Sequence, residues 1–363
     1  MNALRRLPIF LFFSLASGWA GACAICAPSD AQNTLVRQLA AAERVVLAQP
    51  AVTSSARVTA TATVALRGAL PQALLTFDKP HATQGMQPVR PDDLLLLVLN
   101  VGGAGWAALG YLPPSRESWL RDLAKPLTAA SNAGAALDKT KRVARDLEDD
   151  YPLVAQAAYD DLSAQPYAVL RALAPTLDGR RVAQWVGDPS RSSRRPLYYL
   201  LLGLSGKTAD ADALAAQALR AEPGRSAAEL SAVIAAVVAL RGEAGLAWVE
   251  QHFLSTPGVS DADVQAALLA LSVHGTDASA VSQNQVVAVY DRFVHSNPQR
   301  AGFVASDLAT WGHWEFAEAF GSALRAGGTQ VFVSRYAMVF YLLRNPQPEV
   351  KRLVETLRAE KLL

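Results

Sequence analysis

The sequence predicts an α+β protein in which a small β-rich module, residues 23–125, is followed by an all-α region, residues 141–363. Residues 57–66 alternate between apolar and polar side chains, with the period of two that is typical of a half-buried strand. After residue 140, by contrast, helix-length apolar segments follow one another with Gly or Pro between them. Hydrophobic residues make up 51% of the 363 and charged residues 18%, so the composition excludes a disordered chain.

The first 22 residues have the pattern of a secretory signal peptide. Arg5 and Arg6 precede an apolar stretch, residues 7–16, and Ala20-Gly21-Ala22 is typical of a cleavage site. Removing residues 1–22 removes two Arg and no acid, which leaves 34 − 2 = 32 basic and 32 acidic side chains. We therefore expect an exported protein, periplasmic or extracellular, and no nucleic-acid partner, since the mature chain is formally neutral.

Two cysteines, Cys23 and Cys26, directly follow the predicted cleavage site and are the only ones in the chain. Ala27 stands where a c-type haem attachment needs His, so covalent haem is excluded. Three alternatives remain open: a disulfide, a redox or metal-binding thiol pair, and lipidation of Cys23. Lipidation would make the protein a membrane-anchored one, although Ala20 occupies the place where a lipoprotein signal usually has Leu.

In the β-rich module we expect one helix, residues 29–42, and five strands. The strands are predicted at residues 44–48, 57–66, 74–77, 94–101 and 106–112. Residues 93–112 are apolar enough to suggest a membrane helix. Asn100-Val101-Gly102-Gly103 in the middle and Pro113-Pro114 at the end favour a buried hairpin instead.

This order of elements, behind a cysteine that follows a signal peptide, resembles a netrin-like module. That family includes the tissue inhibitors of metalloproteinases, and the resemblance implies an OB-type β-barrel. Those inhibitors begin Cys-x-Cys and carry many disulfides, whereas this chain has Cys23 and Cys26 alone, so protease inhibition is not implied.

Residues 126–140 are rich in small and polar side chains and predict a linker. Helices are predicted at residues 151–164, 167–177, 180–186, 195–204, 210–221, 226–241, 244–254, 261–273, 283–294, 313–325, 331–343 and 348–361. Many are apolar over most of their surface, so each must pack against its neighbours in a stack.

Asp188-Pro189, Arg194 and the apolar run that closes at Leu202-Gly203 resemble the second half of a HEAT repeat. The resemblance implies a HEAT-like α-solenoid in which Asp188 and Arg194 form structural bonds between repeats. Residues 157–160, 166–167, 240–246 and 307–311 also resemble an uncharacterised family of exported bacterial proteins. Its members join a Cys-x-x-Cys start and a β module to HEAT-like helices, and the resemblance implies no activity.

No catalytic motif is present in the sequence. The five His are not spaced to share a metal, and the chain has no Gly-x-Ser-x-Gly elbow, phosphate-binding loop or dinucleotide fingerprint. We therefore expect no catalytic residue, no metal site and no cofactor. The acidic run at residues 146–150 lacks the glycine of a calcium loop and is interpreted as a solvated helix face.

Trp311, His313 and Trp314 are the candidate ligand-binding residues, because two indoles and an imidazole around Gly312 could stack on a sugar or peptide. The alternative is that these side chains pack between helices. Five arginines could likewise form an anion-binding patch or a ladder of structural Arg–Asp contacts: Arg180, Arg181, Arg191, Arg194 and Arg195.

The function that these patterns favour is that of a non-enzymatic scaffold, which binds a protein or peptide of the cell envelope on a helical-repeat surface. The alternative is a thiol-disulfide or copper-handling protein that uses Cys23 and Cys26.

Overall fold

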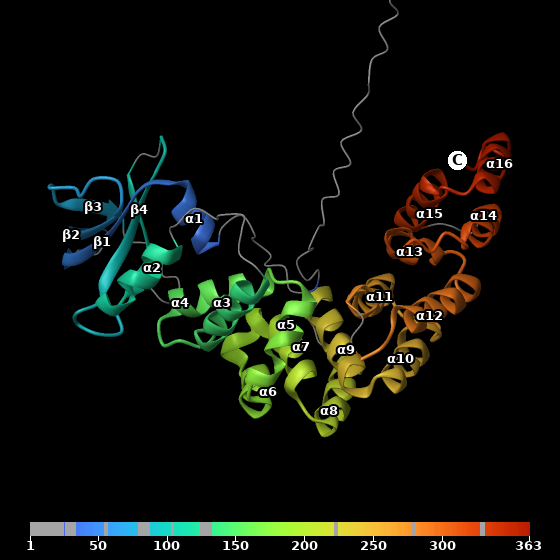
Figure 1. Ribbon diagram of the computed structural model, residues 1–363, viewed down its shortest axis with the longest axis horizontal. Helices are drawn as coiled ribbons and strands as arrows, with labels where there is room; N and C mark the ends of the chain where they lie inside the picture. The colour runs from blue at the N-terminus through green and yellow to red at the C-terminus, as the bar shows by residue number, and fades with distance from the viewer. Residues whose placement is uncertain are drawn as a thin grey trace, which may run out of the picture.

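The computed structural model describes residue 25 and residues 34–53, 57–78, 88–102, 105–123, 133–220, 224–277, 280–326 and 331–363. These residues form an α+β fold, in which a curled five-stranded antiparallel sheet is followed by a largely helical region (Figure 1). The fold class predicted from the sequence is therefore confirmed. The predicted signal peptide lies outside the described residues, as do Cys23 and Cys26.

The sheet has the strand order β3-β2-β1-β4-β5, and every neighbouring pair is antiparallel. Its strands are β1 (Ala42–Thr53), β2 (Arg57–Arg67), β3 (Leu75–Asp78), β4 (Leu94–Asn100) and β5 (Trp106–Leu112). The pairing of β1 with β2 shifts register at three places, and such irregularities bend and twist a strand. The sheet therefore curls until its two edge strands, β3 and β5, approach each other as a half-barrel.

The apolar stretch at residues 93–112 forms the β4–β5 hairpin, as predicted. Leu95 pairs with Tyr111 and Leu99 with Trp106 across this hairpin. Every residue from Leu94 to Val98 is buried. In the part of the chain that the structure describes, no helix has the length and apolarity needed to cross a bilayer.

Helix α1 (Leu35–Ala41) precedes the sheet and is shorter than the predicted helix of residues 29–42. Leu35 and Leu39 are buried in the core of the β module. The guanidinium of Arg67, at the end of β2, donates to the carbonyl oxygens of Leu39 and Ala42, at 2.6 and 3.2 Å. These contacts satisfy carbonyls that the end of a helix leaves without partners.

The helical region contains α3 (Ala133–Arg145), α4 (Pro152–Ser163), α5 (Tyr167–Leu173), α6 (Gly179–Gly187), α7 (Arg195–Ser205), α8 (Thr208–Leu219), α9 (Ala227–Arg241), α10 (Glu243–Val249), α11 (Asp261–Thr276), α12 (Gln283–Ser296), α13 (Ala305–Trp311), α14 (Ala317–Arg325), α15 (Phe332–Arg344) and α16 (Pro348–Ala359). Short helical turns η2 (Ala174–Thr176), η3 (Pro189–Arg194), η4 (Glu250–Leu254) and η5 (Ala301–Val304) join some of them. Between the sheet and this region lie η1 (Pro114–Arg116) and α2 (Glu117–Leu123).

These helices pack mainly on their neighbours in the chain and curve into an arc (Figure 1). Helices α11, α13 and α15 lie on the inner side of the arc, and α10, α12, α14 and α16 lie on the outer side. Helix α9 is buried from Glu229 to Val238 because α7, α8, α10 and α11 all pack on it. A methyl group on Gly203 of α7 would come within 2.6 Å of the Ala236 Cα, so glycine is what allows α7 and α9 to pack this closely.

Helix α4 belongs to the core of the β module as much as to the helical region. Its residues Val154 and Ala157 are buried among the same side chains as Leu96 and Val98 of β4. Leu153 packs against Gly110 of β5, where a methyl group would lie 3.3 Å from the Leu153 Cβ. The sheet therefore closes one end of the helical array through a shared core.

Some helix bounds differ from those predicted. Residues 133–140 of the predicted linker lie in α3. Helices α2 and α13 were not predicted, and the predicted helix of residues 313–325 begins only at Ala317. Helix α13 ends at Gly312, whose φ of +79° is the left-handed conformation, so the next helix starts later than predicted.

Candidate functional site

Ile25, the residue that the sequence places between Cys23 and Cys26, is 1% exposed. It belongs to the large core cluster of the helical region, not to either cluster of the β module. The predicted β module of residues 23–125 therefore includes one residue that packs with the helices. The two cysteines themselves lie outside the described residues.

Trp311 is packed between helices. Its indole stacks on Tyr290 of α12, with ring centroids 5.7 Å apart and planes 12° from parallel. A methyl group on Gly275 of α11 would lie 2.5 Å from the Trp311 ring, so the indole fits over the bare backbone of that glycine. The indole nitrogen donates to the Thr276 hydroxyl at 3.3 Å. Trp311 thus joins α11, α12 and α13, as the packing alternative describes.

His313 and Trp314 lie next to Trp311 in sequence but contact α15 instead. The His313 Nδ1 is 2.8 Å from Glu315 Oε1, and its carbonyl accepts from the Tyr341 hydroxyl at 2.6 Å. The ring of Trp314 lies 5.2 Å from that of Tyr341. Trp311 thus packs on α11 and α12 while His313 and Trp314 contact α15, and all three side chains remain half-buried.

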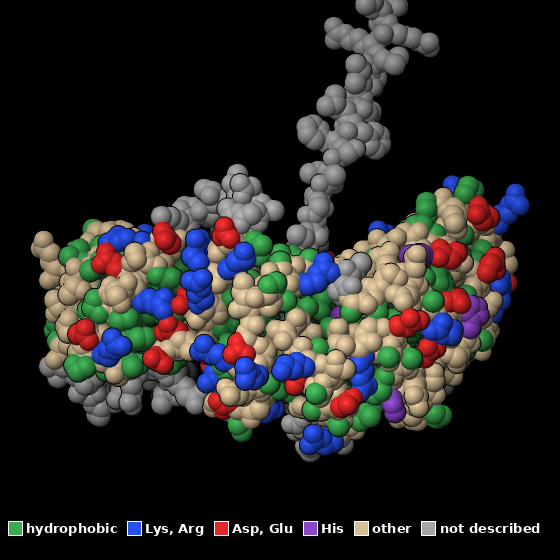
Figure 2. All heavy atoms as spheres, turned by 60° about the horizontal axis from the view of Figure 1, so that its bottom comes forward, with side chains coloured by type: hydrophobic (Ala, Val, Ile, Leu, Met, Phe, Trp, Pro, Cys, Tyr) green, Lys and Arg blue, Asp and Glu red, His purple; other side chains and the backbone are tan. Residues whose placement is uncertain are grey.

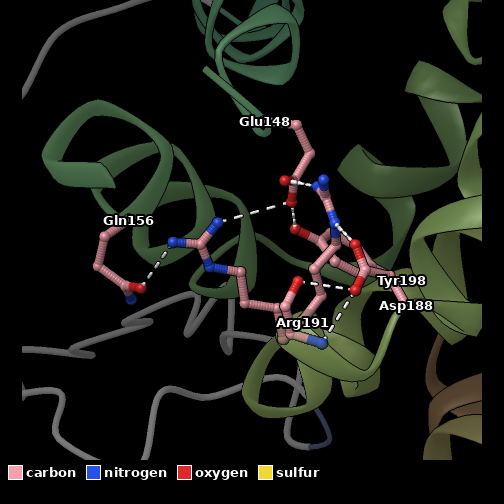
Figure 3. A network of polar contacts seen from close by, with 7 residues as sticks. Glu148, Gln156, Asp188, Arg191 and Tyr198 are labelled. Carbon is pink, nitrogen blue, oxygen red and sulfur yellow. Dashed lines mark hydrogen bonds and ion pairs between the residues drawn. The ribbon is translucent and has the colours of Figure 1, made fainter. Parts of the chain in front are cut away.

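A cluster of polar side chains lies where α3 and α4 meet η3 and α7 (Figure 3). Glu148, in the turn after α3, pairs with the guanidinium of Arg191 and accepts a hydrogen bond from the Tyr198 hydroxyl. Arg194 lies 3.5 Å from the same carboxylate and donates to Gln156 Oε1 at 3.2 Å. Burial raises the pKa of Tyr198, so the phenol keeps the proton that it donates.

Asp188, at the start of η3, also belongs to this cluster because it bonds to Arg191. Its carboxylate accepts from the Arg191 Nε at 2.8 Å and from the backbone and hydroxyl of Ser190 at 2.9 and 2.7 Å. The bonds from Ser190 lower the pKa of Asp188. Figure 3 shows Arg191 extended toward both carboxylates. Asp188 therefore caps η3 and orients Arg191. Arg191 and Arg194, between α6 and α7, bond to Glu148 in the turn between α3 and α4.

Three of the arginines form structural ion pairs, more often with glutamate than with the aspartate that was expected. Arg191 and Arg194 share Glu148, and Arg195 lies 3.4 Å from Glu229 of α9. Arg181 lies 5.3 Å from the ring centroid of Trp185, in cation–π geometry. Glu148, Asp188 and Glu229 thus supply acidic partners for Arg191, Arg194 and Arg195.

The interpretation of residues 146–150 as a solvated helix face is wrong. Helix α3 ends at Arg145, and the turn that follows directs the acidic side chains toward basic partners. Asp146 and Asp149 both pair with Arg116 of η1, at 3.1 Å for Asp146. Sequence reasoning missed these pairs because their members lie on different elements, far apart along the chain.

A second buried polar pair was also missed. The Tyr290 hydroxyl donates to Asp307 Oδ2 at 2.9 Å and lies 3.1 Å from the Leu268 carbonyl oxygen. Burial raises the pKa of both Asp307 and Tyr290. Tyr290 is also the ring on which Trp311 stacks, so this pair fixes the packing of α12 against α13.

Among the described residues, no three His, Cys, Asp or Glu side chains lie close enough together to hold a metal ion. A small cavity of about 90 Å³ lies between α1, β5 and α4. Organic ligands usually occupy pockets of at least ~300 Å³, so this one has room only for a few water molecules. Its lining residues are Leu35, Gln38, Leu109, Leu153, Gln156, Ala157 and Asp160.

The face seen in Figure 2 carries Lys and Arg side chains interspersed with Asp and Glu, with no large field of one sign. Comparison with protein-family models, with curated proteins and with solved structures found no match to this chain. The function is therefore inferred from the chain's own residues.

Proposed function

We propose that this protein is an exported, non-enzymatic scaffold that binds a protein or peptide partner on the inner surface of its helical arc. The observation that carries the proposal is the arc itself, in which helices pack on their neighbours and curve in one direction (Figure 1). Stacked helix pairs of this kind provide the extended concave surfaces on which repeat proteins bind their partners.

Two further observations support this proposal. The candidate residues Trp311 and Trp314 pack between helices, so the arc is held in a fixed shape rather than opened for a small ligand. The predicted mature chain, with 32 basic and 32 acidic side chains, favours a partner recognised by local contacts over one recognised by net charge.

Photo-cross-linking at matched threonines tests the proposal. Thr310 is exposed on α13, on the inner side of the arc, and Thr356 is exposed on α16, on the outer side. Each hydroxyl bonds only locally, to the carbonyl four residues earlier, at 2.8 and 2.9 Å. A photo-reactive amino acid at either position should therefore leave the fold intact.

We expect Thr310→benzoylphenylalanine to capture one protein in the cell envelope that Thr356→benzoylphenylalanine does not capture. The captured protein, once purified, should bind the wild-type chain saturably in isothermal titration calorimetry. Equal capture from both faces, or the absence of saturable binding, would contradict the proposal.

The burial of Ile25 favours a second candidate function, a thiol-disulfide or copper-handling protein that uses Cys23 and Cys26. A residue between the two cysteines that is anchored in the helical core gives a thiol pair a rigid support. The double variant Cys23→Ser/Cys26→Ser should then change the copper content or the thiol titration of the purified protein. An unchanged result in both measurements would remove this candidate.

Export and lipidation are tested by the intact mass of the protein that a bacterial host processes from the full precursor. Cleavage after Ala22 should give a chain that begins at Cys23. A mass two daltons below the reduced value would indicate a disulfide, and added acyl chains would indicate a lipid anchor. An uncleaved chain would contradict the predicted export.

A further inference from the structure

Helix α15 carries an unusual concentration of exposed apolar side chains. Phe332 is 78% exposed, Val333 62% and Tyr336 63%. Phe340 and Leu343 are 48% and 51% exposed. Half of the large apolar side chains that are exposed in the described part of the chain lie on this one helix, including every aromatic one. Surface patches of this kind mark sites of association.

The five side chains lie on one face of α15. Their spacing of three and four residues places them within about a third of the helix circumference. Tyr336 and Phe340 stack on each other, with centroids 6.3 Å apart and planes 14° from parallel. At the end of the same face, the guanidinium of Arg344 lies 5.3 Å from the Phe340 ring centroid. The face is therefore ordered before anything binds to it.

The pattern of this face is symmetric about residue 338. Counting outward from that position, Tyr336 and Phe340 are equally distant, as are Val333 and Leu343. Phe332 and Arg344 are also equally distant. Two identical helices that pack antiparallel about a two-fold axis at this level would bring each residue opposite its counterpart.

We propose that this face is the dimer interface of the protein and that its occupant is α15 of a second copy. In the pair, Tyr336 packs on the partner's Phe340, and Val333 packs on the partner's Leu343. Phe332 receives the partner's Arg344 in a cation–π contact. Each of these three contacts occurs twice in the dimer, as the two-fold symmetry of an isologous interface requires. Helix α15 contains no acidic residue, so the interface buries no carboxylate of this helix without a partner.

The area of this face allows the affinity of the dimer to be estimated. A covered aromatic side chain buries about 150–250 Å², so two copies of this face bury roughly 1,000 Å² in total. That area lies at the lower end of specific interfaces. We therefore expect a reversible dimer with a dissociation constant on the order of micromolar. This proposal goes beyond the proposed function. Helix α15 lies on the inner side of the arc, and sedimentation of the purified chain tests its self-association without the other partner.

Sedimentation velocity of the purified full chain, at concentrations that span the expected dissociation constant, tests the proposal. We expect wild type to pass from monomer to dimer, and we expect Val333→Lys and Leu343→Glu each to weaken dimerisation at least about tenfold. The matched controls are Val101→Lys, at a position 77% exposed, and Leu219→Glu, at a position 48% exposed. Circular dichroism should show all four variants folded, because each replaces an exposed side chain.

A mixture of the two α15 variants tests the antiparallel register. When Val333→Lys and Leu343→Glu chains are combined, the introduced Lys and Glu face each other and the second Val–Leu pair is wild type, so a heterodimer should form. A mixture of Val333→Glu with Leu343→Glu should remain monomeric. Dimerisation in the first mixture alone supports the register.

Four results would overturn the proposal. Wild type could remain monomeric throughout the concentration range, the control variants could weaken dimerisation as much as the α15 variants, or the charge-complementary mixture could fail to associate. The fourth is flotation of monomeric wild type with phosphatidylglycerol vesicles, lost in Val333→Lys, which would make α15 a membrane contact.

Discussion

The Tyr151 hydroxyl donates a hydrogen bond of 2.8 Å to Asp93 Oδ1, across the junction between the sheet and the helical region. Asp93 is 2% exposed, and its second oxygen accepts from the backbone nitrogens of Val89 and Arg90 at 2.7 Å each. Burial, and then the neighbouring Asp93, raises the pKa of Tyr151 to about 12, so the phenol remains a donor at neutral pH. One carboxylate thus joins the loop before β4 to the start of α4.

Asp93→Asn should destabilise the protein by about 2 kcal/mol, because an amide offers one acceptor oxygen where three donors need partners. Asp92→Asn is the matched control, since Asp92 is the exposed neighbour, and it should change the free energy of unfolding by less than about 0.5 kcal/mol. Urea denaturation followed by circular dichroism measures both. Equal stability of the two variants would show that the junction does not depend on this bond.

The Glu148 carboxylate faces two guanidinium groups and one phenol, so its removal should be costly. Glu148→Gln leaves Arg191 and Arg194 partly buried without their shared anion, and we expect a loss of about 2–3 kcal/mol. Glu250→Gln also breaks a pair with an arginine, but Arg292 is 55% exposed there, so the loss should stay below about 1 kcal/mol. Unfolding free energies that do not differ between the two variants would contradict the structural role of Glu148.

Gly302 tests how closely η5 approaches α15. A Cβ built on Gly302 would collide with the backbone carbonyl of Ser334, and the Gly302 nitrogen donates to the Ser334 hydroxyl at 3.0 Å. Gly302→Ala should cost about 3 kcal/mol, since the collision is with backbone that cannot move aside. Gly187→Ala, where nothing lies within 4 Å of the added methyl group, should be neutral or slightly stabilising. Thermal unfolding of both variants gives the comparison, and similar losses would refute the close approach.

Ile25 offers a graded test of the contact between its own side chain and the core of the helical region. Ile25→Val should cost about 1 kcal/mol and Ile25→Ala about 3 kcal/mol, as expected for a side chain in a packed core. Val101→Ala, at an exposed position, is the control. Urea unfolding curves in which neither Ile25 variant departs from the control would place this side chain outside the core.

The sequence predicted the elements better than their contacts. The alternation of residues 57–66 correctly indicated β2, and the apolar residues of 226–241 correctly indicated the buried helix α9. The shared core of β4 and α4 could not be predicted, because Asp93 and Tyr151 stand 58 residues apart and no local period relates them. Contacts between residues so far apart in sequence depend on the tertiary structure alone.

The candidate sites show the same limit. The sequence singled out Trp311, His313 and Trp314 by their composition, but composition does not tell a packed indole from an exposed one. The face of α15 escaped notice for the opposite reason. Residues 331–343 are apolar on nearly all sides, and only the packing of the neighbouring helices decides which of those side chains stay exposed.

His274 of α11 makes the stability of the helical region dependent on pH. The side chain is fully buried, its Nε2 lies 2.9 Å from the Ala235 carbonyl oxygen, and its ring meets Tyr167 edge-on. Burial lowers the pKa of His274 to about 4 from an ordinary value of 6.5. The folded state therefore holds a neutral imidazole that donates to the carbonyl, whereas the unfolded chain takes up a proton near pH 6.5.

A pKa that is lower in the folded state favours folding above the unfolded value, and that stability is lost as the pH falls toward the folded value. We expect the free energy of unfolding to decrease by roughly 3 kcal/mol between pH 7 and pH 4 on account of His274. His274→Gln can keep a donor near Ala235 but does not titrate, so this part of the decrease should vanish in urea titrations across the range. His295→Gln, at an exposed position on α12, should retain it. A decrease of the same size in His274→Gln and in wild type would show that other groups cause the acid sensitivity.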